Sequence, residues 1–142
     1  MSAETMAALT PLRGLWRTSG HVLDGSGRRT AEITGTDEYE LMTGGQWLIH
    51  RVDVLVGGAR TVALELIGDP GEDGTFAMRA FDGSGAYDEM RLSVADGGVL
   101  HLAGEGVRST LRVDRDAMEA LWERDDGVRW VPWMEMRFDR IR

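Results

Sequence analysis

The chain has 142 residues, a formal net charge of −8 and no cysteine. A chain of this length fits a single domain built around one core. Its 16 basic residues are all arginine, and the acidic balance repels phosphate backbones, so nucleic acid is not expected as a partner. The lack of cysteine excludes disulfides and thiolate metal sites.

Residues 1–13 are expected to form a leader with one short helical turn. The run from Glu4 to Leu9 suits a turn of helix, and Pro11 ends it. The leader has no basic segment followed by an apolar stretch, so we expect no secretory signal. No apolar run reaches the roughly 20 residues that cross a bilayer. These features favour a cytoplasmic protein without membrane contact.

Residues 14–142 are predicted to form one all-β domain, a single antiparallel up-and-down barrel of about ten strands. Short runs of alternating apolar and polar residues are separated by turns rich in Gly and Asp, a rhythm typical of a sandwich or a barrel. The barrel is favoured because consecutive hairpins give up-and-down order and closure removes the exposed edges. The expected strands are 15–23, 30–41, 46–56, 60–68, 75–82, 86–94, 99–104, 107–113, 117–124 and 128–141.

Two polar residues interrupt the apolar face of the expected strand 30–41. One face of that strand is wholly polar and should meet water, whereas Asp37 and Tyr39 share the other face with Ile33 and Leu41. An inward acid beside a phenol needs partners. These partners are either backbone groups of a turn near the barrel mouth or a bound ligand.

The chain resembles the lipocalin/calycin barrels at Gly14-Leu15-Trp16, where a Gly-x-Trp begins the first strand and the indole plugs one end. In lipocalins an arginine near the last strand lies over that indole, which implies Arg137 or Arg140 here. More of the chain is similar to a bacterial family of calycin-like barrels, domain-of-unknown-function family 1579. The similar segments are residues 35–40, 44–45, 50–54, 65–69, 79–82 and 122–134. This resemblance implies a barrel with an interior cavity and no established reaction.

The related nitrobindin-like barrels bind heme through a histidine near the C-terminal end. The histidines of this chain are His21, His50 and His101, so it departs from that pattern. Heme or nitric-oxide binding is therefore the weakest alternative, and no cofactor is predicted. No grouping of His, Asp or Glu has the spacing of a zinc site, and no metal is predicted.

His50 and Glu65 are the candidate catalytic pair. If Gly57-Gly58 forms a two-residue turn, Val56 faces Ala59 and the ladder places His50 opposite Glu65. Opposed side chains lie about 5 Å apart on one face, and a carboxylate that holds an imidazole can act as a general base. The other interpretation is a polar pair with a structural role, and a slip of one residue would exchange the partners.

The predicted ligand-binding residues are Asp37, Tyr39, Arg79, Trp122 and Met134. Arg79 faces Glu89 if Gly83-Ser84-Gly85 is a three-residue loop, which fits a surface ion pair as well as a ligand contact. Trp122 and Met134 suit an adaptable apolar wall.

The function expected from these features is binding of a small apolar or amphipathic molecule inside the barrel. A small cofactor-free enzyme, such as a cyclase, isomerase or hydrolase with His50 as base, is the alternative from another class. A module that forms homodimers through Trp47 or Trp133 is a further one. The sequence does not say which face of the strands between residues 46 and 94 points inward.

Overall fold

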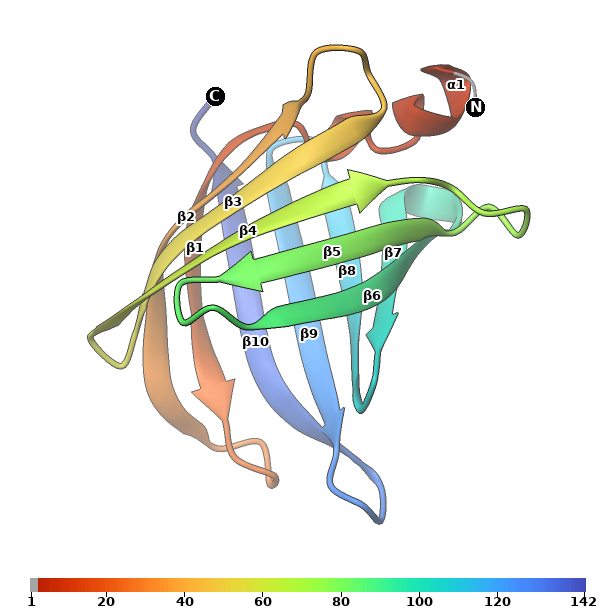
Figure 1. Ribbon diagram of the computed structural model, residues 1–142. Helices are drawn as coiled ribbons and strands as arrows, with labels where there is room; N and C mark the ends of the chain where they lie inside the picture. The colour runs from red at the N-terminus through yellow and green to blue at the C-terminus, as the bar shows by residue number, and fades with distance from the viewer. Residues whose placement is uncertain (1–2) are drawn as a thin grey trace.

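The computed structural model describes residues 3–142 as one closed barrel of ten antiparallel strands. Each strand pairs with the next one along the chain, and β1 closes the ring by pairing with β10 (Figure 1). The expected all-β, up-and-down barrel is confirmed, and the predicted strand ends lie within two residues of the observed ones. The strands are β1 (Gly14–Leu23), β2 (Arg29–Leu41), β3 (Trp47–Val56), β4 (Ala59–Gly68), β5 (Phe76–Asp82), β6 (Tyr87–Val94), β7 (Val99–Gly104), β8 (Val107–Asp114), β9 (Ala117–Asp125) and β10 (Trp130–Arg140).

The alternation in β2 decides which face points inward. Ile33, Asp37 and Tyr39 are 1%, 4% and 8% exposed, whereas Glu32 and Glu40 on the other face are exposed. Residues directly opposite each other in a ladder point to the same side of the sheet. The inward residues of β2 therefore identify the inward residues of the strands that pair with it. The inward face therefore carries Asp37 and Tyr39, as their place among apolar residues predicts.

A two-residue turn sets the register of β3 and β4. Gly57 and Gly58 have φ angles of 58° and 85°, a left-handed conformation that suits a tight hairpin and that glycine adopts without strain. Val56 pairs with Ala59, and His50 then pairs with Glu65. The predicted register is confirmed.

The N-terminal segment closes one end of the barrel. It consists of α1 (Ala3–Ala7) and the 3-10 helix η1 (Thr10–Leu12), which lie across the upper end in Figure 1. Leu9 and Leu12 are each 1% exposed, and Trp16 is fully buried and donates its indole N–H to the carbonyl of Leu12 at 2.8 Å. No helix among residues 3–142 is long and apolar enough to cross a membrane.

Arg140 fastens this N-terminal segment, the plug of the closed end, to the barrel wall. Its guanidinium lies 4.2 Å from the centre of the Trp16 ring, which confirms the arginine-over-indole arrangement for Arg140 rather than Arg137. It also donates hydrogen bonds to the carbonyls of Pro11, Arg13 and Arg115, at distances of 2.6–3.2 Å. From the end of β10, this side chain thus joins the leader, β1 and the β8–β9 turn.

Replacement of Arg140 by Met is expected to lower the free energy of unfolding by about 2–3 kcal/mol. Met keeps much of the apolar stem, but three carbonyl oxygens and the Trp16 ring lose their cationic partner. Urea unfolding measures the change, with Arg137→Met as control because the ion pairs of Arg137 among residues 3–142 are with Glu119 and Asp139 on the outer face. Equal losses in the two variants would show that Arg140 does not fasten the plug.

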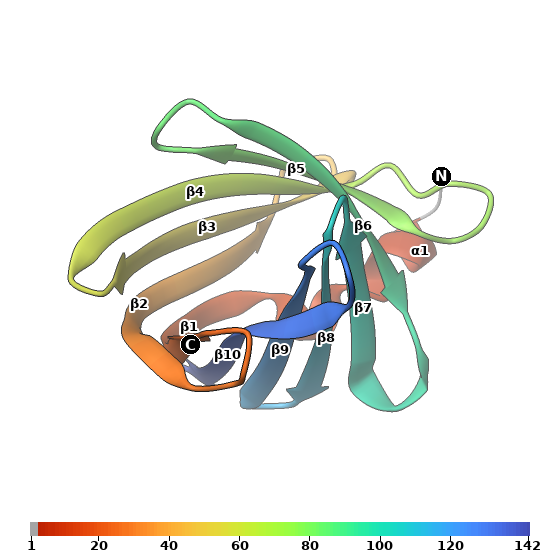
Figure 2. The same cartoon turned by 90° about the horizontal axis from the view of Figure 1, so that it is seen from below.

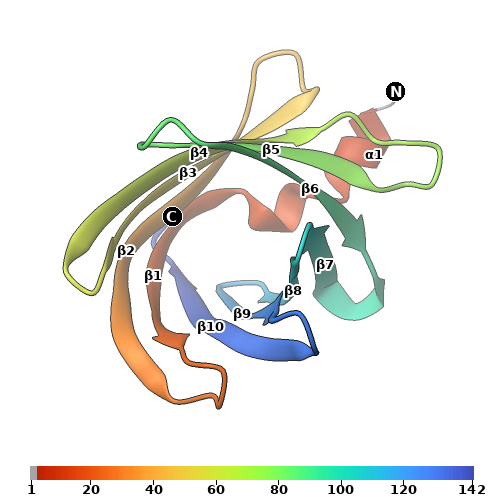
Figure 3. The same ribbon diagram turned by 60° about the horizontal axis from the view of Figure 1, so that its bottom comes forward.

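The inward face becomes more exposed toward the opposite end of the barrel. Along β4, Ile67 is 1% exposed, Glu65 is 7% exposed, Ala63 is partly exposed and Thr61 is exposed. The inward face of β5 shows the same gradient, and on β6 exposure rises from Leu92 through Met90 to Asp88. Solvent therefore enters the barrel from the end that carries the β1–β2, β3–β4 and β9–β10 hairpins, which faces the viewer in Figures 2 and 3.

Candidate functional site

Four side chains predicted as site residues meet on the inward face of β2, β3 and β4. The His50 imidazole lies between two carboxylates, with Nε2 at 2.6 Å from Asp37 Oδ2 and Nδ1 at 3.0 Å from Glu65 Oε1. The Tyr39 ring stacks on the imidazole, with ring centroids 4.0 Å apart and planes inclined by 10°. The structure therefore brings Asp37, Tyr39, His50 and Glu65 together, and we call these four residues the imidazole cluster.

Strand register explains this assembly. His50 pairs directly with Tyr39 on one side and with Glu65 on the other, so these three side chains form one row across the wall. Asp37 pairs with Val52, one row toward the open end, and reaches His50 along the diagonal. Gly35 gives the adjoining strands their close approach, because a Cβ atom there would lie 2.3 Å from the carbonyl oxygen of Asp53.

The imidazole cluster is buried, and its members hold one another in place. The side chains of Asp37, Glu65 and His50 are only 5%, 9% and 12% exposed. Thr18, 1% exposed on β1, donates its hydroxyl to Asp37 Oδ1. Both oxygens of Asp37 and both nitrogens of His50 are therefore engaged, and the ring has one fixed orientation.

The two carboxylates change the protonation of His50. Burial disfavours the charged ring and lowers its pKa, but the hydrogen bonds and charges of Asp37 and Glu65 outweigh burial and raise the pKa from 6.5 to about 9. His50 is therefore an imidazolium at neutral pH. Burial and the neighbouring carboxylates also raise the pKa of the Tyr39 phenol, which stays protonated.

The imidazole cluster has one net negative charge wherever its protons lie. Each of the two nitrogen–oxygen contacts needs one proton. Two carboxylates and an imidazole that share two protons have a net charge of minus one, whether His50 holds both protons or a carboxyl group holds one. A buried group of this kind attracts a positive partner.

This geometry disfavours proton abstraction by His50. A general base needs a free lone pair within reach of its substrate, and both nitrogens here face carboxylate oxygens. Across residues 3–142, no group of three or more His, Asp or Glu side chains has the arrangement of a metal site. The arrangement suits recognition of a charged or hydrogen-bonding group.

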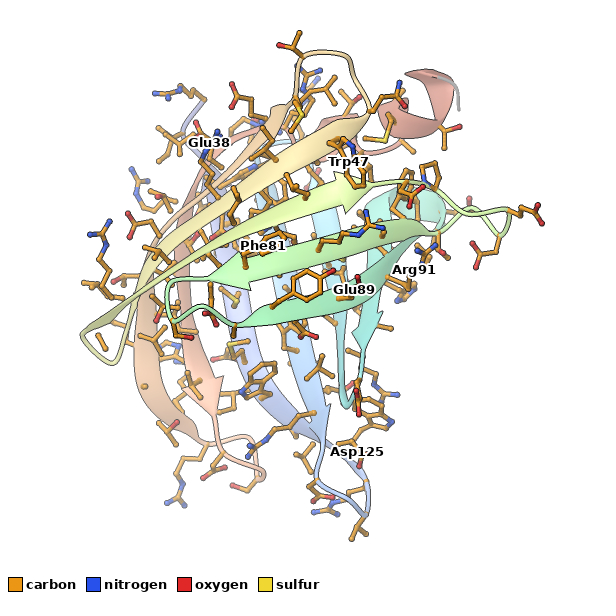
Figure 4. The ribbon with its side chains drawn as sticks, in the orientation of Figure 1. Glu38, Trp47, Phe81, Glu89, Arg91 and Asp125 are labelled. Atoms are coloured by element: carbon orange, nitrogen blue, oxygen red, sulfur yellow. The ribbon has the colours of Figure 1, made fainter. Side chains whose placement is uncertain are left out.

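The remaining predicted residues lie elsewhere. Arg79 pairs with Glu89 in the ladder, as predicted, but on the outer face, where it contacts Asp69 at 3.3 Å and lies over the Trp47 ring. Figure 4 shows Trp47 and Glu89 on that outer side. The structure therefore does not bring Arg79 to the imidazole cluster.

Trp122 and Met134 pair with each other across β9 and β10, on the wall opposite β3 and β4. Both are partly buried, and the Trp122 ring meets the Trp133 ring edge-on at 6.1 Å. They lie on the inward face of the barrel but do not contact the imidazole cluster through any ring or hydrogen-bond interaction described for residues 3–142.

Sequence reasoning missed Thr18 and Ser109. Thr18 is a polar residue between Trp16 and Gly20 on an inward face, a signal of the kind that singled out Asp37. Ser109 lies inward on β8 between Leu102 and Trp122, and its hydroxyl oxygen is buried without a hydrogen-bond partner among the described residues. The sequence signal for Ser109 is a hydroxyl residue at a position where the alternation calls for an apolar side chain, because Leu111 lies two residues later on the same face.

Two conservative substitutions distinguish these hydroxyls. Thr18→Val is expected to lower the free energy of unfolding by about 1–3 kcal/mol, because Asp37 loses a donor. Ser109→Ala is expected to leave it unchanged or to raise it by about 1 kcal/mol, because an unsatisfied group leaves the core. Urea unfolding of the ligand-free protein measures both. A loss at Ser109 equal to that at Thr18 would contradict the difference in their bonding.

No protein-family model and no curated protein matches this sequence.

Proposed function

We propose that this chain binds a small, partly apolar organic molecule inside the barrel, and that the imidazole cluster orients its polar group. The observation that carries this proposal is a buried, net-negative cluster on an inward face where a core would carry apolar side chains. Such a group is costly to bury and favours a bound partner. Because several segments of the sequence resemble the calycin-like barrels, we also propose that this chain belongs to that family.

Glu65 has the carboxylate oxygen of the imidazole cluster that is available to a ligand. Its Oε1 accepts from His50, and Oε2 forms no hydrogen bond among residues 3–142. From Glu65 the inward face of β4 leads through partly exposed Ala63 to exposed Thr61. A ligand that enters from the open end along this face of β4 therefore reaches Glu65 and its unbonded oxygen.

The inward faces of β6, β9 and β10 supply apolar contact. Met90, Trp122 and Met136 are partly buried and pack against the core. Methionine side chains adapt to varied shapes, which suits a ligand surface. The hollow of about 700 Å³ is lined mainly by outward-facing residues such as His21 and Arg137, with Met136 also in its lining, and the hollow of about 610 Å³ is lined mainly by outward-facing residues such as Leu64.

Titration with N-phenyl-1-naphthylamine, a neutral apolar fluorophore, tests the proposal. We expect a saturable rise in fluorescence with one site per chain. Ala63→Trp fills the inward path and is expected to weaken binding at least about tenfold. Leu64→Trp, on the exposed outer face next to it, is the matched control and should stay within about twofold of wild type.

Circular dichroism checks that both variants fold, and Ala80→Leu replaces Ala63→Trp if that variant does not. Ala80 pairs with Glu65 on the inward face of β5. Absence of saturable binding in the wild type, or equal effects of the inward and outward substitutions, would overturn the proposal.

A further inference from the structure

Among the residues that the structure describes, the negative charge of the imidazole cluster is paired with no cation other than His50 itself. Among the ion pairs of residues 3–142, Asp37 and Glu65 each pair with His50 and with no arginine. Arg140 is committed to the carbonyls of the closed end. Arg124 lies at the exposed end of β9, on the opposite wall.

Further acids share the inward face between the imidazole cluster and the open end. Asp88 pairs with Ala80, which pairs with Glu65, so Asp88 extends the row of His50 and Glu65. Asp82 pairs with Ala63 one row further out. Both aspartates are exposed. The inward face of β2 to β6 is therefore acidic along the path to the buried cluster, which raises the local concentration of cations.

Ser109 is an independent sign that the interior receives a polar partner. It lies inward on β8, five strands around the ring from β3, and so on the opposite wall of the barrel from His50. Its side chain is 4% exposed, and its hydroxyl has no partner among the described residues. An unsatisfied hydroxyl in a core is unfavourable and is retained where something else bonds to it.

We infer that the ligand is an organic cation, an amine with an apolar body and a second polar group. Its ammonium donates to Glu65 Oε2 and balances the negative charge of the imidazole cluster. Its body lies along Met90 and Trp122, and its second polar group reaches Ser109. This inference rests on the proposed function and names the ligand class for that site.

Three probes with one naphthalene body test the inference, each in competition with N-phenyl-1-naphthylamine at pH 7. They are 2-(1-naphthyl)ethylamine, 2-(1-naphthyl)ethanol and 1-naphthaleneacetate, which are cationic, neutral and anionic. We expect the amine to bind at least about tenfold more tightly than the alcohol, and the carboxylate to bind most weakly.

Glu65→Gln is expected to reduce the amine-to-alcohol ratio to about twofold or less. Glu38→Gln is the matched control, because it makes the same charge change on the outer face of β2, next to Asp37 in the chain. It should keep the wild-type ratio. If Glu65→Gln does not fold, Asp88→Asn replaces it and should lower the ratio by a smaller factor.

The outcomes separate the two proposals. If the fluorophore binds but the alcohol competes as well as the amine, the cation inference is overturned and the lumen site stands. Equal loss in Glu65→Gln and Glu38→Gln would assign the preference to the whole acidic surface and would also overturn the inference. If the fluorophore does not bind, the lumen site itself is wrong.

Discussion

Replacement of His50 by Phe is expected to lower the free energy of unfolding by about 3–5 kcal/mol at pH 7. Phe keeps an aromatic ring against Tyr39, but it leaves Asp37 and Glu65 buried and without the cation that lies between them. Removal of one partner from a buried charge pair is strongly destabilising because the remaining charge stays uncompensated. Urea unfolding followed by tryptophan fluorescence measures the loss.

His21→Phe is the control for this change. His21 lies on the outer face with a 30% exposed side chain, 3.6 Å from Glu135. Its replacement is expected to change the free energy of unfolding by less than about 1 kcal/mol. A His50 variant as stable as the His21 variant would show that the imidazole cluster does not depend on its cation.

The stability of the wild-type protein is expected to fall as the pH rises from about 6.5 through 9. His50 has a pKa of 6.5 when unperturbed and about 9 in the folded protein. Because the folded value is the higher one, the stabilisation is fully present below pH 6.5 and is lost as the pH rises through 9. At 1.36 kcal/mol per pKa unit, the loss amounts to about 3 kcal/mol.

The measurement is a series of urea unfolding curves between pH 6 and 9.5, taken for wild type and for His50→Phe. The difference between the two proteins isolates His50 from the other titrating groups. It should be largest near pH 6 and should shrink through pH 9. A difference that stays constant across this range would contradict a raised pKa for His50.

The part of the imidazole cluster that sequence reasoning predicted is the part set by a short turn. Gly57-Gly58 leaves one register for β3 and β4, so the pairing of His50 with Glu65 follows from counting residues. The pairing of Arg79 with Glu89 follows in the same way from the three residues of the next hairpin. In both cases local backbone geometry decides which residues are opposed.

The Asp37–His50 contact could not be predicted from the sequence, for a physical reason. The link of residues 42–46 between β2 and β3 is longer than a tight turn and permits several registers, and the contact itself is diagonal. The inward face of β3 was equally open, because both faces carry apolar residues: Ile49 and Leu55 on one, Val52 and Val54 on the other. Burial in the closed barrel decides between them.

The pairing of β1 with β10 joins the two ends of the chain, since Trp16 lies opposite Arg140. During synthesis, no ring can close until the final strand has left the ribosome, and until then the first strand presents an unsatisfied edge. Loss of β10 would therefore do more than remove one strand. It would open a seam along the length of the protein and expose two strand edges to self-association.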